Sequence, residues 1–116
     1  MRLAEREQRR IRMLEFSNVT VVKKANTYFG GSVTSRTVIF QDGSRKTLGL
    51  MLRGEYEFNT ADKELMEILA GEAEVLLRGE ESWSVFREGD VFEVEADSSF
   101  RIRTSGILDY CCSYIS

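Results

Sequence analysis

The sequence contains no histidine, which restricts the chemistry available to it near neutral pH. Ser-His-Asp and Cys-His catalytic sites are excluded, as are metal sites built on imidazole ligands. Proton transfer would have to use carboxylates, cysteine, tyrosine, lysine or water. The two cysteines, Cys111 and Cys112, are neighbours in the chain. Because adjacent residues of a strand point to opposite faces, we expect two reduced thiols and no disulfide between them.

The elements that must position any site are predicted to be short β-strands. Glycine-containing turn signals recur along the chain and separate segments rich in Val, Ile, Phe, Tyr and Thr, a pattern typical of an all-β fold. The expected strands are 33–40, 46–52, 73–78, 83–87, 91–95 and 107–115. Helical character is predicted only for residues 1–14 and 61–68. So many short strands must avoid exposed edges, which favours a closed barrel or a jelly roll.

Length and composition indicate one folded domain. The chain has 116 residues, of which 42% are hydrophobic and 30% charged, and we expect an N-terminal extension (1–14) followed by a β-domain (15–116). Residues 1–12 carry a charge of +3, which leaves −6 for the remainder, and this acidic body argues against nucleic-acid binding. No apolar run is long enough to span a bilayer and no secretory signal is visible, so a cytoplasmic protein without membrane contact is expected.

Two segments resemble the motifs of cupins, the jelly-roll family built on a double-stranded β-helix. Glu64 precedes Gly71 at the spacing of the first motif, and the segment from Gly89 to Phe100 follows the spacing of the second. The resemblance implies a single cupin-like domain. It also fixes which positions would hold a metal ion in a metal-binding member of that family.

Those metal positions lack the usual ligands. The histidine positions fall on Phe58, Thr60 and Phe100, while a spacer one residue longer would instead place Glu57 and Asn59 at the first two. We prefer the first alignment because Tyr56 and Phe58 form the apolar face of their strand, which should point inward. With Glu64 as the one carboxylate left, expected to be a solvated loop residue, no metal site is predicted.

A narrower resemblance covers residues 26–115, nearly the whole body of the chain. The string Gly54-Glu-Tyr-x-Phe-x-Thr-Ala61 resembles the small bacterial pyrimidine/purine nucleoside phosphorylase family. The further matching segments are 25–35, 49–53, 83–86, 89–94, 98–100 and 110–114. Two departures are visible: the family commonly has Pro-Gly at Glu95-Ala96 and often has Arg at the position of Ser113.

This resemblance implies metal-independent phosphorolysis of purine and pyrimidine nucleosides to free base and pentose-1-phosphate, with broad base specificity. Inorganic phosphate would be the co-substrate, and no other cofactor is implied. Such chemistry needs cationic or hydroxyl donors for phosphate, a carboxylate for the positively charged sugar of the transition state, and aromatic rings for the base. A homodimer is expected by analogy with other cupin-like proteins.

Individual residues can be assigned to these tasks. Arg45, just after a hairpin turn, is the candidate for phosphate, and Thr60 is a catalytic candidate because its hydroxyl occupies an inward position. Glu55 is the candidate carboxylate for the ribose; it is opposite in phase to Tyr56, so a bulge at Gly54 would be needed to turn it inward. We expect two or three of a set of five aromatic residues to contact substrate. The five are Tyr56, Phe58, Phe100, Tyr110 and Tyr114.

Two alternatives remain open at this stage. One is a non-catalytic cupin-like module that binds a small molecule. The other is a structural dimer module whose interior is filled by the same aromatic residues. The size of the interior cavity separates the structural module from the other two interpretations.

Overall fold

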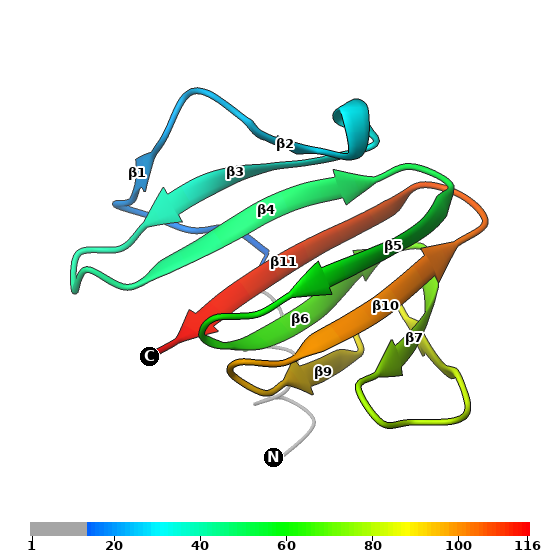
Figure 1. Ribbon diagram of the computed structural model, residues 1–116. Helices are drawn as coiled ribbons and strands as arrows, with labels where there is room; N and C mark the ends of the chain where they lie inside the picture. Colours follow the sequence, from blue (N-terminus) through cyan, green and yellow to red (C-terminus); the bar gives the residue numbers. More distant parts are fainter. Residues whose placement is uncertain (1–13) are drawn as a thin grey trace, which may run out of the picture.

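The computed structural model describes residues 14–116, which form two antiparallel β-sheets facing each other (Figure 1). The predicted extension over residues 1–14 lies, apart from Leu14, outside the described residues. Between residues 14 and 116, no helix has the length and apolar character needed to cross a membrane. The strands are β1 (Thr20–Val21), β2 (Asn26–Tyr28), β3 (Val33–Ile39), β4 (Arg45–Met51), β5 (Gly54–Asn59), β6 (Lys63–Ala70), β7 (Glu72–Leu77), β8 (Ser84–Arg87), β9 (Val91–Val94), β10 (Ser99–Thr104) and β11 (Leu108–Ile115), with a 3₁₀ turn, η1, at Phe29–Gly31.

Sheet A has the strand order β1-β3-β4-β11-β6-β9, with β2 also paired to β3, and sheet B has the order β5-β10-β7-β8. Neighbours in space are therefore often distant in sequence, as in a jelly roll. The predicted all-β, cupin-like jelly roll is confirmed. The two sheets do not join into one hydrogen-bonded ladder, so the fold is a two-sheet sandwich and not a closed barrel.

The expected hairpins are present. Strands β3 and β4 pair around the turn that contains Asp42, whose carboxylate accepts hydrogen bonds from the N–H and hydroxyl of Ser44. Strands β7 and β8 form the second predicted hairpin. The helix predicted over 61–68 is wrong, because residues 63–68 belong to β6 and residues 61–62 form the bend before it. Strand β6 lies between β11 and β9, and pairing on both sides overrides a local pattern that suits either element.

One end of the sandwich is filled by side chains. Val33 and Leu108 of sheet A are fully buried at this end and belong to the same core cluster as Tyr56 and Ile102 of sheet B. Met51, also buried, separates this packed end from the pocket at the other end. Aromatic pairs help to close the two sides, with Phe29 of η1 against Tyr56 at 5.0 Å and Phe86 against Phe92 at 4.8 Å between ring centroids. The opposite end, where β4 and β6 begin, is where the interior is open to ligands.

Candidate functional site

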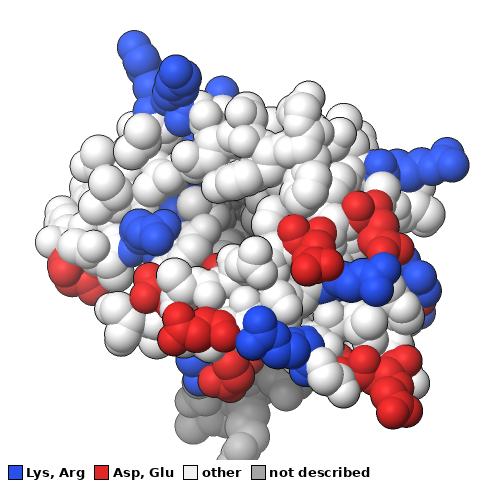
Figure 2. Space-filling model, in the orientation of Figure 1, with Lys and Arg blue, Asp and Glu red and all other residues white. Residues whose placement is uncertain are grey.

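A pocket of about 290 Å³ lies between the two sheets at that end of the sandwich, near the lower limit of typical ligand pockets. On the side of the molecule drawn in Figure 2, the surface is hollowed near the centre, and both basic and acidic side chains lie around the hollow. The lining residues are Tyr28, Ser35, Arg45, Thr47, Met51, Phe58, Asn59, Glu64, Met66, Phe100, Tyr110, Cys112 and Tyr114. The aromatic residues therefore leave part of the interior open. The alternative of a structural dimer module requires an interior that they fill completely.

Sheet A supplies a polar wall to the pocket. Strand alternation turns Arg45 and Thr47 of β4 inward. The same alternation brings three residues of β11 and one of β6 to this wall: Tyr110, Cys112, Tyr114 and Glu64. The guanidinium carbon of Arg45 lies 3.8 Å from the centre of the Tyr114 ring, a cation–π contact that holds the cation at the pocket. Arg45 itself is exposed, as a group that meets an incoming anion must be.

Glu64 is the carboxylate of this pocket, and it is neither in a loop nor fully solvated, contrary to expectation. It lies in β6, half-buried, and burial raises its pKa above the ordinary value of 4.5. The Cys112 thiol donates a hydrogen bond to Glu64 Oε1 at 3.4 Å, which together with the charge of Arg45 partly offsets that rise in pKa. Burial also raises the pKa of Cys112, so the thiol keeps its proton and acts as the donor.

Two tyrosine hydroxyls face the same space. Burial raises the pKa of Tyr114 to about 12 and that of Tyr110 further, so both hydroxyls stay protonated and can donate hydrogen bonds near neutral pH. The Tyr114 hydroxyl lies 3.3 Å from Thr47 Oγ1. These hydroxyls and the Arg45 guanidinium give the wall from sheet A several hydrogen-bond donors, and Glu64 gives it one carboxylate.

The Tyr110 ring depends on a glycine in the neighbouring strand. Gly49 is the register partner of Tyr110, and a Cβ at this position would lie 2.6 Å from both Cζ and the hydroxyl of Tyr110. The same Cβ would approach the carbonyl oxygen of Thr34 to 2.3 Å. Glycine is thus required for the ring to lie across β4, and the sequence analysis did not identify it, since nothing local marks a glycine in mid-strand as a contact partner.

Sheet B supplies an aromatic wall. The rings of Phe58 and Phe100 stack at 5.6 Å with an interplanar angle of 27°, and Tyr28 of β2 meets Phe58 edge-on at 6.1 Å. Four of the five predicted aromatic residues line the pocket. The exception is Tyr56, which is buried at the filled end, where its hydroxyl donates to the carbonyl oxygen of Leu52 at 2.7 Å. Tyr28 was not predicted as a lining residue, although it lies in one of the matching segments.

The structure does not bring the two predicted catalytic residues into this pocket. The buried Thr60 hydroxyl donates to the carbonyl oxygen of Glu95 at 2.6 Å and accepts from the Ser98 N–H at 3.0 Å, so it ties two loops together. Glu55 lies on the outer face of sheet B in an ion pair with Arg101. The register of β5 on β10 is continuous through Gly54, so the bulge that would turn Glu55 inward is absent.

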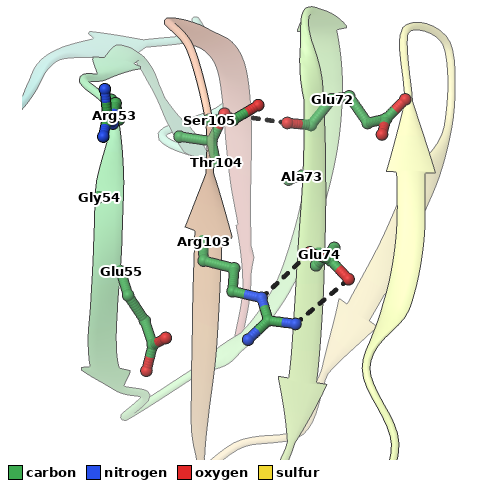
Figure 3. Close-up of a pocket in the computed structure, with 9 residues that line it drawn as sticks. All are labelled: Arg53, Gly54, Glu55, Glu72, Ala73, Glu74, Arg103, Thr104 and Ser105. Carbon is green, nitrogen blue, oxygen red and sulfur yellow. Dashed lines mark hydrogen bonds and ion pairs between the residues drawn. The ribbon is translucent and has the colours of Figure 1, made fainter.

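A second hollow, of about 310 Å³, contains Glu55 and lies on the outer face of sheet B (Figure 3). Figure 3 shows Arg103 and Glu74 pointing toward each other, with hydrogen bonds of 3.1 and 3.3 Å. Glu72 pairs with Arg87 at 2.9 Å. Each carboxylate that lines this hollow therefore has an arginine partner, and the hollow behaves as a solvated, charge-paired surface.

The residues at the cupin metal positions do not fit a metal ion. Phe58 and Phe100 carry no donor atoms, the Thr60 hydroxyl is committed to backbone groups, and Glu64 alone is too few ligands for a transition metal. Within residues 14–116, no group of three or more Cys, Asp or Glu side chains is placed to hold one.

Solved structures of other proteins have the same fold as this chain. A protein of unknown function from Acinetobacter sp. ADP1 superposes with a TM-score of 0.85 at 43% identity, covering 87% of this chain and 98% of that one. A cupin superfamily protein from Desulfitobacterium hafniense gives a TM-score of 0.60 at 20% identity, with 80% and 84% covered. The second likeness concerns the fold alone.

Comparison of sequences is more specific. A protein of Geotalea daltonii named pyrimidine/purine nucleoside phosphorylase is 59% identical over 104 residues, covering 90% of this chain and all of that one. A protein of the same name from Leptospira interrogans is 55% identical over 103 residues, with 89% and 97% covered. The family model for pyrimidine/purine nucleoside phosphorylase matches residues 23–114. With its jelly-roll sheets and matching sequence, the chain belongs to the pyrimidine/purine nucleoside phosphorylase family.

Proposed function

We propose that this protein is a nucleoside phosphorylase, which uses inorganic phosphate to cleave the glycosidic bond of purine and pyrimidine nucleosides. The observation that carries the proposal is the division of the interior pocket into two unlike walls. The wall from sheet A has a cation, hydroxyl donors and a carboxylate, and the wall from sheet B has stacked rings. A nucleoside with a phosphate beside it is divided in the same way, with the phosphate and the sugar suited to the wall from sheet A and the base suited to the wall from sheet B.

Phosphate is assigned to the beginning of β4. The Arg45 guanidinium provides paired N–H donors for a phosphate dianion, and its stacking on Tyr114 reduces the freedom it would lose on binding. Thr47 and the Tyr114 hydroxyl, 3.3 Å apart, add donors on the same wall. A phosphate oxygen held there would bond to C1′ of the sugar as the C1′–N bond breaks.

Glu64 takes the role that the sequence analysis gave to Glu55. In the transition state the sugar carries positive charge, which an ionised carboxylate stabilises most strongly where water is partly excluded. The Cys112 thiol orients the carboxylate by donating to Oε1 and carries no charge of its own. The electron pair of the broken bond passes to the base nitrogen, which takes a proton from water or a tyrosine hydroxyl.

The base is assigned to the aromatic wall formed by Phe58 and Phe100. Stacking on a ring accepts any base, since all bases have a π-face, whereas selection of one base requires hydrogen bonds to its edges. Phe58 and Phe100 offer no such hydrogen bonds. This composition supports broad base specificity for purines and pyrimidines alike.

The proposed reaction uses nucleosides and phosphate, with no metal and no other cofactor. Accordingly, treatment with a chelator followed by dialysis should leave turnover unchanged, and restoration of lost turnover by an added divalent metal would contradict this part of the proposal. No step requires nucleic acid or a membrane.

The decisive experiment measures phosphate-dependent release of free base. The purified protein would be incubated with uridine and, separately, with adenosine, with and without inorganic phosphate, and free base and pentose-1-phosphate would be quantified. We expect equal amounts of both products, formed only with phosphate present. Base release without phosphate would indicate a hydrolase. Nucleoside binding without base release would favour the non-catalytic small-molecule-binding module.

A further inference from the structure

A row of residues crosses sheet A from its β2 side to the pocket. Strand register pairs Asn26 of β2 with Ser35 of β3, and Ser35 in turn with Gly49 of β4. Gly49 is paired with Tyr110 of β11, which completes the row. Because Gly49 has no side chain, the Tyr110 ring extends over it, and the Tyr110 hydroxyl reaches toward β3. The row therefore links a side chain of β2 to a hydroxyl that lines the pocket.

The hydrogen bonds of this row run in one direction. Asn26 Nδ2 donates to Ser35 Oγ at 3.2 Å and to Thr37 Oγ1 at 3.2 Å. An amide nitrogen offers donors alone, so Ser35 accepts from Asn26 and keeps its own proton for another partner. That partner is Tyr110: burial raises the pKa of Tyr110, and a side-chain hydrogen bond with Ser35 partly offsets that rise. Since Ser35 donates and Tyr110 accepts, the Tyr110 proton is left to point into the pocket.

The Tyr110 hydroxyl lies away from the position assigned to phosphate. Along β4, Gly49 is four residues beyond Arg45, about 13 Å at the usual rise of a strand. The Tyr110 hydroxyl lies against Gly49 and thus at this deeper level. Tyr28, in the same strand as the first residue of the row, meets the Phe58 ring edge-on at 6.1 Å. A base stacked on Phe58 therefore lies at the end of the pocket that the row borders.

The departing base is the group that a hydroxyl at this end would stabilise. As the C1′–N bond breaks, its electron pair passes to the base, which gains negative charge. A hydrogen bond donated to that charge is stronger in the transition state than in the bound nucleoside. Purines offer ring nitrogens and pyrimidines a carbonyl oxygen as acceptors, so one hydroxyl donor serves both classes. A hydroxyl whose proton was turned toward Ser35 could not form this hydrogen bond.

We propose that Asn26 is a positioning residue for phosphorolysis, which acts through Ser35 to direct the Tyr110 hydroxyl proton toward the departing base. Tyr110 donates the hydrogen bond and keeps its proton, and the base takes its final proton from water. The inference rests on the proposed nucleoside phosphorylase activity. It adds to that activity a row of residues in which Tyr110 touches the substrate and Asn26 acts from outside the pocket.

The test compares two nucleosides whose bases leave in different ways. Guanine departs from guanosine with negative charge, whereas 7-methylguanosine has a positively charged base that leaves as a neutral molecule. Asn26→Asp keeps the size of the side chain but replaces the amide donors by acceptors, so Ser35 would donate to the new carboxylate and Tyr110 to Ser35. We expect kcat for guanosine to fall roughly tenfold or more, while kcat for 7-methylguanosine falls less than about threefold. Tyr110→Phe should show the same difference between the two nucleosides.

Thr37→Val is the matched control, because it removes the other acceptor of Asn26 and leaves the hydrogen bond to Ser35 in place. It should leave kcat for both nucleosides nearly unchanged. Equal losses with both nucleosides in Asn26→Asp, at native circular dichroism, would mean that Asn26 only fixes β2 to β3, and would overturn the inference. A loss in Thr37→Val as large as that in Asn26→Asp would overturn it as well.

Two further results keep the inference separate from the activity and from folding. Wild-type protein that releases no base from either nucleoside would overturn the proposed function, whereas active wild-type protein with equal losses in the variants would overturn this inference alone. If Asn26→Asp does not fold, Ser35→Ala interrupts the row at its next residue and should again lower kcat for guanosine far more than kcat for 7-methylguanosine. Equal losses in Ser35→Ala would reject the role of the row.

Discussion

The two hollows of this molecule have nearly equal volumes, about 290 Å³ between the sheets and about 310 Å³ on the outer face of sheet B. Their chemistry differs. In the outer hollow each carboxylate is neutralised by an arginine of the same sheet, as Glu74 is by Arg103. In the interior pocket Glu64 is half-buried with a raised pKa, and within residues 14–116 Arg45 stacks on the Tyr114 ring and forms no ion pair with a carboxylate. The two hollows thus differ in whether their charged groups are paired within the sheet, and this difference, more than volume, is the reason why we propose the interior pocket as the site of reaction.

The largest effect should appear when one carboxylate of each hollow is replaced in turn and the two variants are compared. Glu64→Gln removes the negative charge near the sugar, and we expect kcat/KM to fall roughly 100- to 1000-fold, by analogy with loss of one transition-state-stabilising group. Glu55→Gln, on the outer face, should change kcat/KM less than twofold. Steady-state kinetics with uridine and saturating phosphate would measure both. A larger loss for Glu55→Gln would return the role of the catalytic carboxylate to Glu55.

Arginines allow a second comparison. Arg45→Ala removes a charge-assisted donor worth about 1.5–3 kcal/mol, so the KM for phosphate should rise roughly 10- to 100-fold. The KM for the nucleoside should change much less. Arg103→Ala, in the outer hollow, should leave both KM values unaltered. An equal rise in both constants for Arg45→Ala would remove its assignment to phosphate.

A substitution at Thr60 tests whether this predicted catalytic residue contributes to stability and not to turnover. Thr60→Val keeps the shape of the side chain but leaves the Glu95 carbonyl and the Ser98 N–H without their hydroxyl partner. We expect the free energy of unfolding in urea to fall by about 1–3 kcal/mol. Turnover per folded molecule at low temperature should be unchanged, and a loss of turnover without a loss of stability would make Thr60 catalytic after all.

Much of the fold could be predicted because its signals are local. The turn at Asp42-Gly43 and the two-residue period of the flanking strands specify the β3–β4 hairpin without reference to the rest of the chain. Residues 61–68 could not be assigned in this way. Leu65, Met66 and Leu69 suit a helical face as well as a strand, and the pairing that decides between them comes from β11, more than 40 residues later.

The positions of the candidate site residues could be predicted only as far as the strands that carry them. The inward position of Tyr114 follows from the phase of the strand expected over 107–115, which the structure contains as β11. Arg45 was chosen for its place just after a hairpin turn, and it proves to be the first residue of β4, one residue before the strand expected over 46–52. Glu64 was missed because its segment was expected to be a helix or a loop, which gives no inward phase. Thr60 lies outside the pocket because β5 ends at Asn59, after which the chain turns and the hydroxyl meets backbone groups of another loop.

The smallest expected effect is a dependence of stability on pH that separates the two hollows. Because burial raises the pKa of Glu64 above 4.5, the folded protein holds this proton more tightly than the unfolded chain does. The contribution of Glu64 to the free energy of unfolding is then largest below pH 4.5 and is lost as pH rises through the folded-state pKa. Its slope cannot exceed about 1.4 kcal/mol per pH unit. Glu64→Gln should remove this decline from urea titrations between pH 4 and 7, and Glu55→Gln should retain it, since Glu55 is ion-paired at the surface. If the decline survived in Glu64→Gln, the carboxyl would be no harder to ionise in the pocket than in water, and the electrostatic distinction between the hollows would fail.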